Sequence, residues 1–176
     1  MTMTITKMKS YRHCFNRGFG LMEILVASAI ISASLFALAG TAQLAFRVIA
    51  ENSNKVQAEF LAEEGLEVVR ILRDSSWSSN IPPLSSGISY YPVFSSTSST
   101  WMLASNDPGL IEGLFSRVAI FDDVYRRDSD DDIVASTSPD SNTLDEGTKQ
   151  VTSRVSWQDD EKYVEFTTYI TDMFSN

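Results

Sequence analysis

A long run of apolar residues near the start of the chain is its strongest pattern. From Phe19 to Phe46 the sequence reads FGLMEILVASAIISASLFALAGTAQLAF, and Glu23 is the only charged residue in it. A helix rises 1.5 Å per residue, so this run would be about 42 Å long, and about 20 apolar residues suffice to cross the hydrocarbon core of a bilayer. The pattern therefore predicts that residues 19–46 form a transmembrane helix.

Residues 47–74 have an amphipathic pattern instead. They are mostly good helix formers, and no proline occurs between Gly18 and Pro82, so the helix can continue past the membrane. Apolar residues at helical spacing share one broad face, with charged residues opposite. The members of this apolar face are Ile49, Val56, Phe60, Leu61, Val68, Ile71 and Leu72. We expect the second half of the helix, residues 47–74, to pack this face against a folded domain.

A polar segment follows at residues 75–112. Of the 34 residues from 75 to 108, 14 are Ser or Thr and four are Pro, a composition typical of loops. Several aromatic residues interrupt it, among them Trp77 and Trp101. The composition predicts a connecting loop whose aromatic side chains pin it in places to a neighbouring sheet.

Residues 113–176 have the patterns of β-strands. The stretch 115–125 is rich in β-branched and aromatic residues, and apolar residues alternate with polar ones over 151–157 and over 164–170. Such alternation indicates two half-buried strands of an antiparallel hairpin, joined here by a five-residue turn. Taken together, the patterns predict an α+β fold in which a long N-terminal helix, transmembrane in its first half, packs on a C-terminal antiparallel β-sheet.

The charges are unevenly distributed along the chain. Residues 1–18 carry four basic residues and no acidic one, whereas the remainder carries 23 acidic and 10 basic residues. Basic residues collect on the cytoplasmic side of a membrane helix, so we expect a cytoplasmic N-terminus and a C-terminal domain outside the cytoplasm. The acidic remainder lacks the clustered Lys and Arg that phosphate backbones require, so no nucleic acid is expected as a direct partner.

An ordinary secretory signal peptide is one alternative for this N-terminus. Its apolar region has about 7–15 residues and ends at a small-x-small cleavage site. The run here is longer, and cleavage near Ala37 or Ala39 would discard a well-formed segment. The carboxylate of Glu23 also argues against it, because a charge in the membrane costs roughly 3 kcal/mol and is rarely without a role.

The junction between the basic segment and the apolar run carries a family resemblance. The stretch Arg17–Ala27 reads RGFGLMEILVA and closely resembles the class III signal of type IV prepilins and of type II secretion pseudopilins. In that family a short basic leader ends in Gly, Phe usually follows, and Glu is the fifth residue of the mature chain. Two small departures are Gly20, where Thr or Ser is usual, and Gly40, where many major pilins have Pro.

The resemblance implies a role for each junction residue. Residues 1–18 would be a leader that prepilin peptidase removes between Gly18 and Phe19, and Phe19 would become an N-methylated terminus. Glu23 would serve subunit assembly, since a buried carboxylate and a buried amine cost far less as a pair than alone. The alternative for Glu23 is that its carboxylate merely reaches the lipid headgroups.

The resemblance also implies a function and partners. The chain would be a structural subunit of a type IV pilus or a type II secretion-like pseudopilus in the bacterial inner membrane. Its partners would be prepilin peptidase, the assembly platform, other pilins and membrane lipid. A minor subunit is favoured for two reasons. Major pilins commonly close their C-terminal region with a disulfide, whereas the only cysteine here is Cys14 in the leader. The stretch Glu59–Glu67 is also rich in like charges, which would oppose close packing of many identical copies. A signal-anchored, single-pass protein displaying a ligand-binding β domain is the alternative.

Candidate chemistry is sparse in the sequence. Asp128, Asp130 and Asp132 alternate as the start of an EF-hand does, but the Gly and Glu that such a loop needs are missing, so they are weak calcium candidates beside a solvated loop. The only histidine is His13, and no nucleophile-elbow or phosphate-binding glycine pattern occurs. We therefore expect no enzyme activity and no cofactor, and a membrane-tethered hydrolase is improbable.

Overall fold

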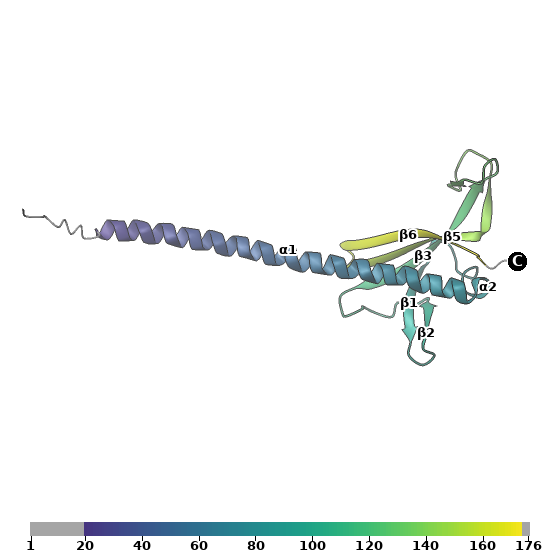
Figure 1. Ribbon diagram of the computed structural model, residues 1–176, viewed down its shortest axis with the longest axis horizontal. Coiled ribbons are helices and arrows are strands. Elements are labelled where there is room, and N and C mark those ends of the chain that lie inside the picture. Colours follow the sequence, from purple (N-terminus) through teal and green to yellow (C-terminus); the bar gives the residue numbers. More distant parts are fainter. Residues whose placement is uncertain (1–19, 174–176) are drawn as a thin grey trace, which may run out of the picture. The chain divides into compact units, whose positions relative to one another are not determined.

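The computed structural model describes residues 20–173. Its longest element is helix α1, Leu21–Ser75, which a short helix α2, Trp77–Asn80, follows (Figure 1). Chain contacts divide the protein into two compact units, residues 1–48 and residues 49–176, and α1 contributes to both. The strands are β1 Ser89–Ser95, β2 Thr100–Ala104, β3 Ser116–Arg127, β4 Ile133–Val134, β5 Asn142–Trp157 and β6 Lys162–Thr171.

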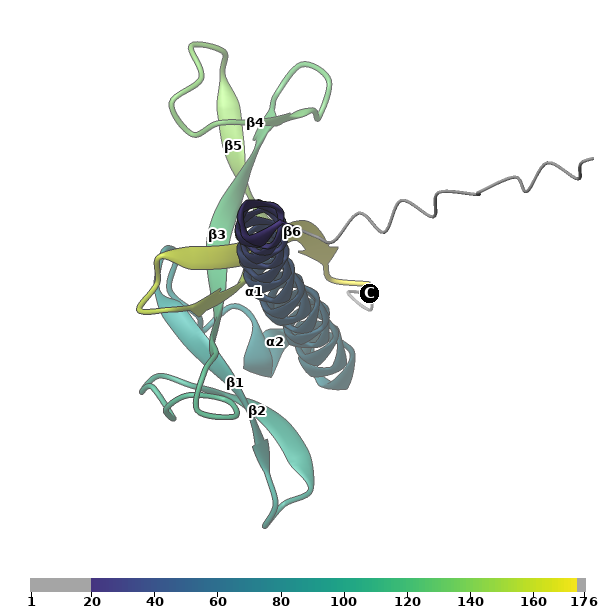
Figure 2. The same ribbon diagram turned by 90° about the vertical axis from the view of Figure 1, so that its left-hand side faces the viewer.

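The six strands form one antiparallel sheet in the second unit. Their order is β2-β1-β3-β5-β6, and the short β4 pairs with β3 beside this path (Figure 2). Strands β5 and β6 pair over ten residues, from Thr148 with Thr171 to Trp157 with Lys162. The predicted C-terminal hairpin is therefore confirmed, and so is the α+β fold class, although the turn between the strands has four residues rather than five.

Strand β5 is much longer than the alternating stretch 151–157. It begins at Asn142 because its first half pairs with the second half of β3. The register shifts between Asp123 and Val124 of β3, since Asp123 pairs with Lys149 and Val124 with Asp145. This bulge bends the strand pair. It accommodates the β5 residues between Asp145 and Lys149, which include a glycine and a glutamate of poor β-propensity.

The expectation of a loop over residues 75–112 is wrong for part of that segment, which holds α2, β1 and β2. Pro92 lies within β1, where the missing N–H of a proline normally breaks a ladder. Strand β1 pairs with β3 only through Ser89 and Tyr90, whereas Pro92 pairs with Leu103 of β2. Proline is tolerated there because β1 has passed the end of its ladder with β3.

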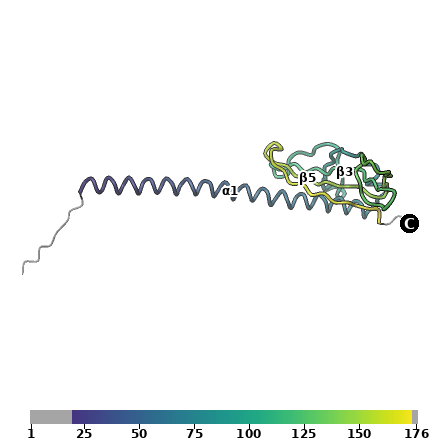
Figure 3. Tube along the Cα trace, turned by 90° about the horizontal axis from the view of Figure 1, so that it is seen from above, coloured from purple at the N-terminus to yellow at the C-terminus, as the bar shows by residue number. Residues whose placement is uncertain are grey.

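The helix face that meets the sheet overlaps with the expected one only in part, since Val68 is buried and Leu61 packs against the core, but most other members are exposed. The buried residues of α1 are Ala58, Ala62, Gly65, Leu66, Val68 and Val69, and Figure 3 shows the strands gathered on one side of this half of the helix. Phe60 is 67% exposed, and Ile49, Val56 and Ile71 are exposed too. Small residues occupy the contact because the helix lies very close to β5: a Cβ on Gly65 would be 2.3 Å from the Ser153 Oγ.

Two apolar clusters form the core between α1 and the sheet. One surrounds Phe121 and includes Val69 of the helix and Ile170 of β6. The other joins Ala62 to Phe115 and Trp157, whose rings meet edge to face with centroids 6.1 Å apart. The second unit thus has its own hydrophobic core, built from one helix face and one sheet face.

Candidate assembly site

The expected cleavage residues Gly18 and Phe19 lie outside the described residues. Glu23 lies in the first turn of α1, and its backbone N–H donates a hydrogen bond of 2.9 Å to the Gly20 carbonyl. A carboxylate in a first turn interacts favourably with the unpaired N–H groups of the helix N-terminus. The structure therefore places the one charge of the apolar run at the end where the helix begins.

Every residue of α1 from Leu21 to Val48 is exposed within the chain. The exposed fractions of its large apolar side chains are high, for example 76% for Leu21 and 79% for Phe36. Burying one such side chain contributes roughly 1.5–3 kcal/mol. A surface of this extent needs lipid or other apolar helices to cover it.

The few hydroxyl groups between Leu21 and Val48 are satisfied within the helix. The Oγ atoms of Ser28, Ser32 and Ser34 donate to backbone carbonyls one turn earlier, over 2.9, 2.8 and 2.9 Å, and the Thr41 Oγ1 does the same. Polar groups that find partners inside their own helix can enter an apolar medium at low cost. By length and composition, α1 is thus a candidate membrane span.

In the described part of the chain, the charged side chain of Glu23 has no such partner. Within residues 20–173, its carboxylate has neither a hydrogen bond nor an ion pair. An isolated carboxylate that enters an apolar environment needs a positive partner or a proton. The apolar helix therefore presents one unmet electrostatic requirement, close to its N-terminal end.

The weak calcium candidates do not converge. The Asp128 carboxylate accepts hydrogen bonds from the hydroxyls of Ser141 and Thr143, which lower its pKa in that order. Asp130 and Asp132 lie instead beside the guanidinium of Arg127, at 2.7 and 3.8 Å.

Arg127 forms ion pairs with three aspartates that lie between β3 and β5, namely Asp130, Asp132 and Asp140. The charge and hydrogen bond of Asp130 raise the pKa of Arg127, followed by smaller effects of Asp140 and Asp132 that add to it, while burial opposes the rise. Within residues 20–173, no group of three or more His, Cys, Asp or Glu side chains is placed to hold a metal ion. The signal for this arrangement in the sequence was the basic pair directly before the aspartates.

Arg117 is a polar anchor that the sequence pattern did not reveal. Its side chain is 5% exposed and forms an ion pair with Glu64 of α1, while its Nη2 donates to the Pro92 carbonyl over 3.1 Å. The guanidinium also lies 5.6 Å from the centroid of the Trp101 ring. Arg117 thereby ties α1 to β1, β2 and β3 in the interior of the second unit.

No family model, curated protein or solved structure matches the chain.

Proposed function

We propose that this chain is a structural subunit, present in few copies, of a type IV pilus or of a type II secretion-like pseudopilus. The observation that carries the proposal is a lone carboxylate, Glu23, at the start of α1, whose apolar first half, up to Val48, no part of residues 20–173 covers. The same helix continues into a folded sheet unit. A chain of this kind can hold its apolar half in a membrane or in a bundle of like helices while its folded half remains in water.

The leader junction supplies the missing charge in this proposal. Cleavage after Gly18 creates an α-amine on Phe19, and N-methylation would keep that amine positive. The Glu23 carboxylate of one subunit then pairs with the Phe19 amine of a neighbour, so that both charges are compensated inside the apolar bundle. Because the pair forms only at one axial offset, it also sets the register between subunits.

The proposed location is the bacterial inner membrane before assembly. The basic residues 1–18 remain in the cytoplasm, where prepilin peptidase removes them, and the sheet unit lies outside the cytoplasm. Other pilins or pseudopilins and the inner-membrane assembly platform are the proposed protein partners.

The N-terminus of the purified membrane protein tests this proposal. Mass spectrometry should find a mature chain that starts at Phe19, and a bulky substitution such as Gly18→Val should leave the leader attached because the peptidase must fit the residue before the cut. Gly20→Ala is the matched control and should be processed normally. A chain that keeps its leader in cells with active peptidase is a signal-anchored protein instead, and the pilin proposal fails.

Assembly is tested separately with Glu23. Glu23→Ala should leave cleavage intact but remove the chain from sheared filament fractions, whereas Glu23→Gln should retain partial incorporation through hydrogen bonding. Ser28→Ala is the control, because this hydroxyl bonds only to its own helix. Normal incorporation of the Ala variant would refute the pairing role of Glu23.

The low copy number rests on charge. Four glutamates lie between residues 59 and 67 of α1, and close packing of identical copies would bring these like charges together. Quantifying this chain against the other pilins in isolated filaments tests the point. If it forms most of the filament mass, it is a major subunit and only the claim of few copies is lost.

A further inference from the structure

Strand β6 leaves one edge of the sheet open. It is the last strand in the order, and no further strand of residues 20–173 pairs with it. It runs for ten residues, contains no proline, and pairs with β5 without a register shift. Proteins usually protect such edges with bulges, prolines or several charges, because an open edge exposes unpaired N–H and C=O groups. Strand β6 carries only Lys162 and Glu165.

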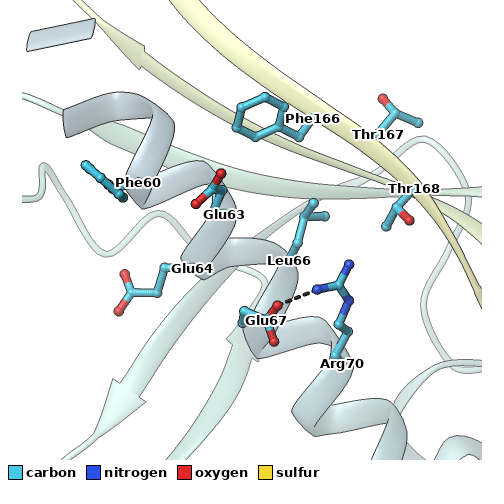
Figure 4. A pocket seen from close by; sticks show the side chains of 9 residues that line it. All are labelled: Phe60, Glu63, Glu64, Leu66, Glu67, Arg70, Phe166, Thr167 and Thr168. Atoms are coloured by element: carbon cyan, nitrogen blue, oxygen red, sulfur yellow. Dashed lines mark hydrogen bonds and ion pairs between the residues drawn. The ribbon is translucent and has the colours of Figure 1, made fainter. Parts of the chain in front are cut away.

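A groove runs between this strand and the flank of α1 (Figure 4). Its volume is about 710 Å³. Three apolar side chains, Phe60, Leu66 and Phe166, form part of its lining. The remaining lining residues are Glu63, Glu64, Glu67, Arg70, Thr167 and Thr168. An open strand edge and a groove with a partly apolar and partly charged lining therefore lie side by side.

The groove has an excess of negative charge. Glu64 forms an ion pair with the buried Arg117, and Glu67 with Arg70. Glu63 has neither a hydrogen bond nor an ion pair among the described residues. The glutamates also outnumber the single arginine of the lining, so a bound side chain with a positive charge would be attracted here.

We propose that the β6 edge accepts a β-strand from a partner protein, and that the groove-facing side chains of this strand are partly apolar and partly Lys or Arg. Added strands gain affinity from main-chain hydrogen bonds and specificity from alternate side chains. Every second side chain would enter the groove, where an apolar one contacts Phe60 and Phe166. A neighbouring basic one, about 6.6 Å further along the strand, reaches Glu63 or Glu67.

A second copy of this chain fits the edge less well. Pairing β6 with β6 would bring two sets of groove glutamates near each other, and like charges across an interface oppose association. The other open strand, β2, reads TWMLA and offers no basic residue. The charge of the groove thus selects a different protein. The inference goes beyond filament assembly, since it needs neither leader cleavage nor Glu23.

Two synthetic peptides of about ten residues, the length that β6 can pair, test the proposal. In both peptides every second residue is Thr. The remaining positions alternate between Phe and Lys in the basic peptide and between Phe and Glu in the acidic peptide. Binding to the full chain in detergent micelles is measured by fluorescence anisotropy. The basic peptide should bind at least about tenfold more tightly than the acidic one, and added salt should weaken it.

Two further measurements locate the binding. Hydrogen exchange should slow at backbone amides of β6 when the basic peptide binds, and not at those of β2. The double variant Glu63→Lys with Glu67→Lys should reverse the peptide preference. Glu165→Lys, on the other face of β6, is the charge control and should retain it.

Three outcomes would overturn the proposal. Equal binding of the two peptides would show that the groove charge selects nothing. Protection at β2 rather than β6 would place the acceptor edge on the opposite side of the sheet. Self-association of the peptide-free chain through β6 would make a second copy the occupant.

Discussion

Replacing Gly65 with alanine probes how closely α1 rests on the sheet. The new Cβ would lie 2.3 Å from the Ser153 Oγ and 3.4 Å from the Arg117 Cδ. Ser153 is fully buried, so its hydroxyl has little room to move aside. Overpacking of this kind costs about 1–3 kcal/mol, whereas alanine gains about 1 kcal/mol over glycine inside a helix. We expect a net loss of about 1 kcal/mol.

Ser153→Ala should reverse the sign of that effect. The Ser153 Oγ is buried and has no hydrogen-bond partner among residues 20–173, so removing it should be neutral or stabilising by up to about 1 kcal/mol. With the hydroxyl gone, the alanine at position 65 meets only ordinary contacts and contributes its helix propensity. The double variant should therefore be more stable than Gly65→Ala alone, with a coupling of about 1–3 kcal/mol.

The assay is urea unfolding of the full chain in detergent micelles, followed through tryptophan fluorescence, to which Trp157 contributes from the core that it shares with Ala62. With a typical slope of about 2 kcal/mol per M of urea, a loss of 1 kcal/mol lowers the urea midpoint by roughly 0.5 M. Gly40→Ala is the control, since a Cβ there would have no neighbour within 4 Å. If Gly65→Ala instead stabilises the protein by the full helix propensity, the close contact is not what positions α1.

Substitutions at two further positions test the polar contacts of the sheet unit. Arg117→Ala should lower the free energy of unfolding by roughly 3 kcal/mol, because it leaves a cavity and removes the donor to the buried Pro92 carbonyl. Urea midpoints should show a smaller loss for Arg117→Met, which keeps most of the packing. Burial raises the pKa of Asp145, but hydrogen bonds from Arg126, Thr148 and the Gly147 N–H outweigh it and lower the pKa overall. At pH values above its ordinary pKa of about 3.9, the ionised carboxylate of Asp145 therefore stabilises the fold in full. This stabilisation is lost as the pH falls through the lowered pKa of the folded state. Asp145→Asn should therefore flatten the pH dependence of the urea midpoint between these two pKa values.

Prediction of secondary structure from the sequence was most accurate for strands in which buried and exposed residues alternate regularly. In β6, Val164, Phe166 and Ile170 face the core while the residues between them face outward, so the period of two was visible. Strand β1 was missed because Pro92 and the surrounding serines are typical of loops. What makes β1 a strand is its ladder with β2, a contact that local composition does not encode.

The helix face was misjudged because larger apolar residues carry more weight in a pattern. Phe60 and Val56 dominate the expected stripe, yet both are exposed, and Ala58, Ala62 and Gly65 are among the residues that α1 buries instead. A close approach favours small side chains, and the distance between two elements is a tertiary property. The exposed Phe60 then lines the groove beside β6.

The candidate functional residues fall into two groups as well: some could be predicted from local sequence and others could not. The Gly-Phe-Glu spacing at residues 18, 19 and 23 is local and could be read directly, and Glu23 lies in the first turn of α1 as the pattern predicts. The grouping of Arg127 with Asp130 and Asp140 depends on the loop geometry between β3 and β5. The burial of Arg117 depends on the packing of α1 against it. No residue near Arg117 in the sequence indicates this packing.

The core cluster that joins Val69 to Ile170 also has a consequence for the order of synthesis. A ribosome adds about 5–20 residues per second, so roughly 5–20 s separate the emergence of these two side chains. During that interval the sheet-facing side of α1 is already made, but the last strand that covers it is not. The side of α1 that faces the sheet is thus made early but is fully covered only near the end of synthesis.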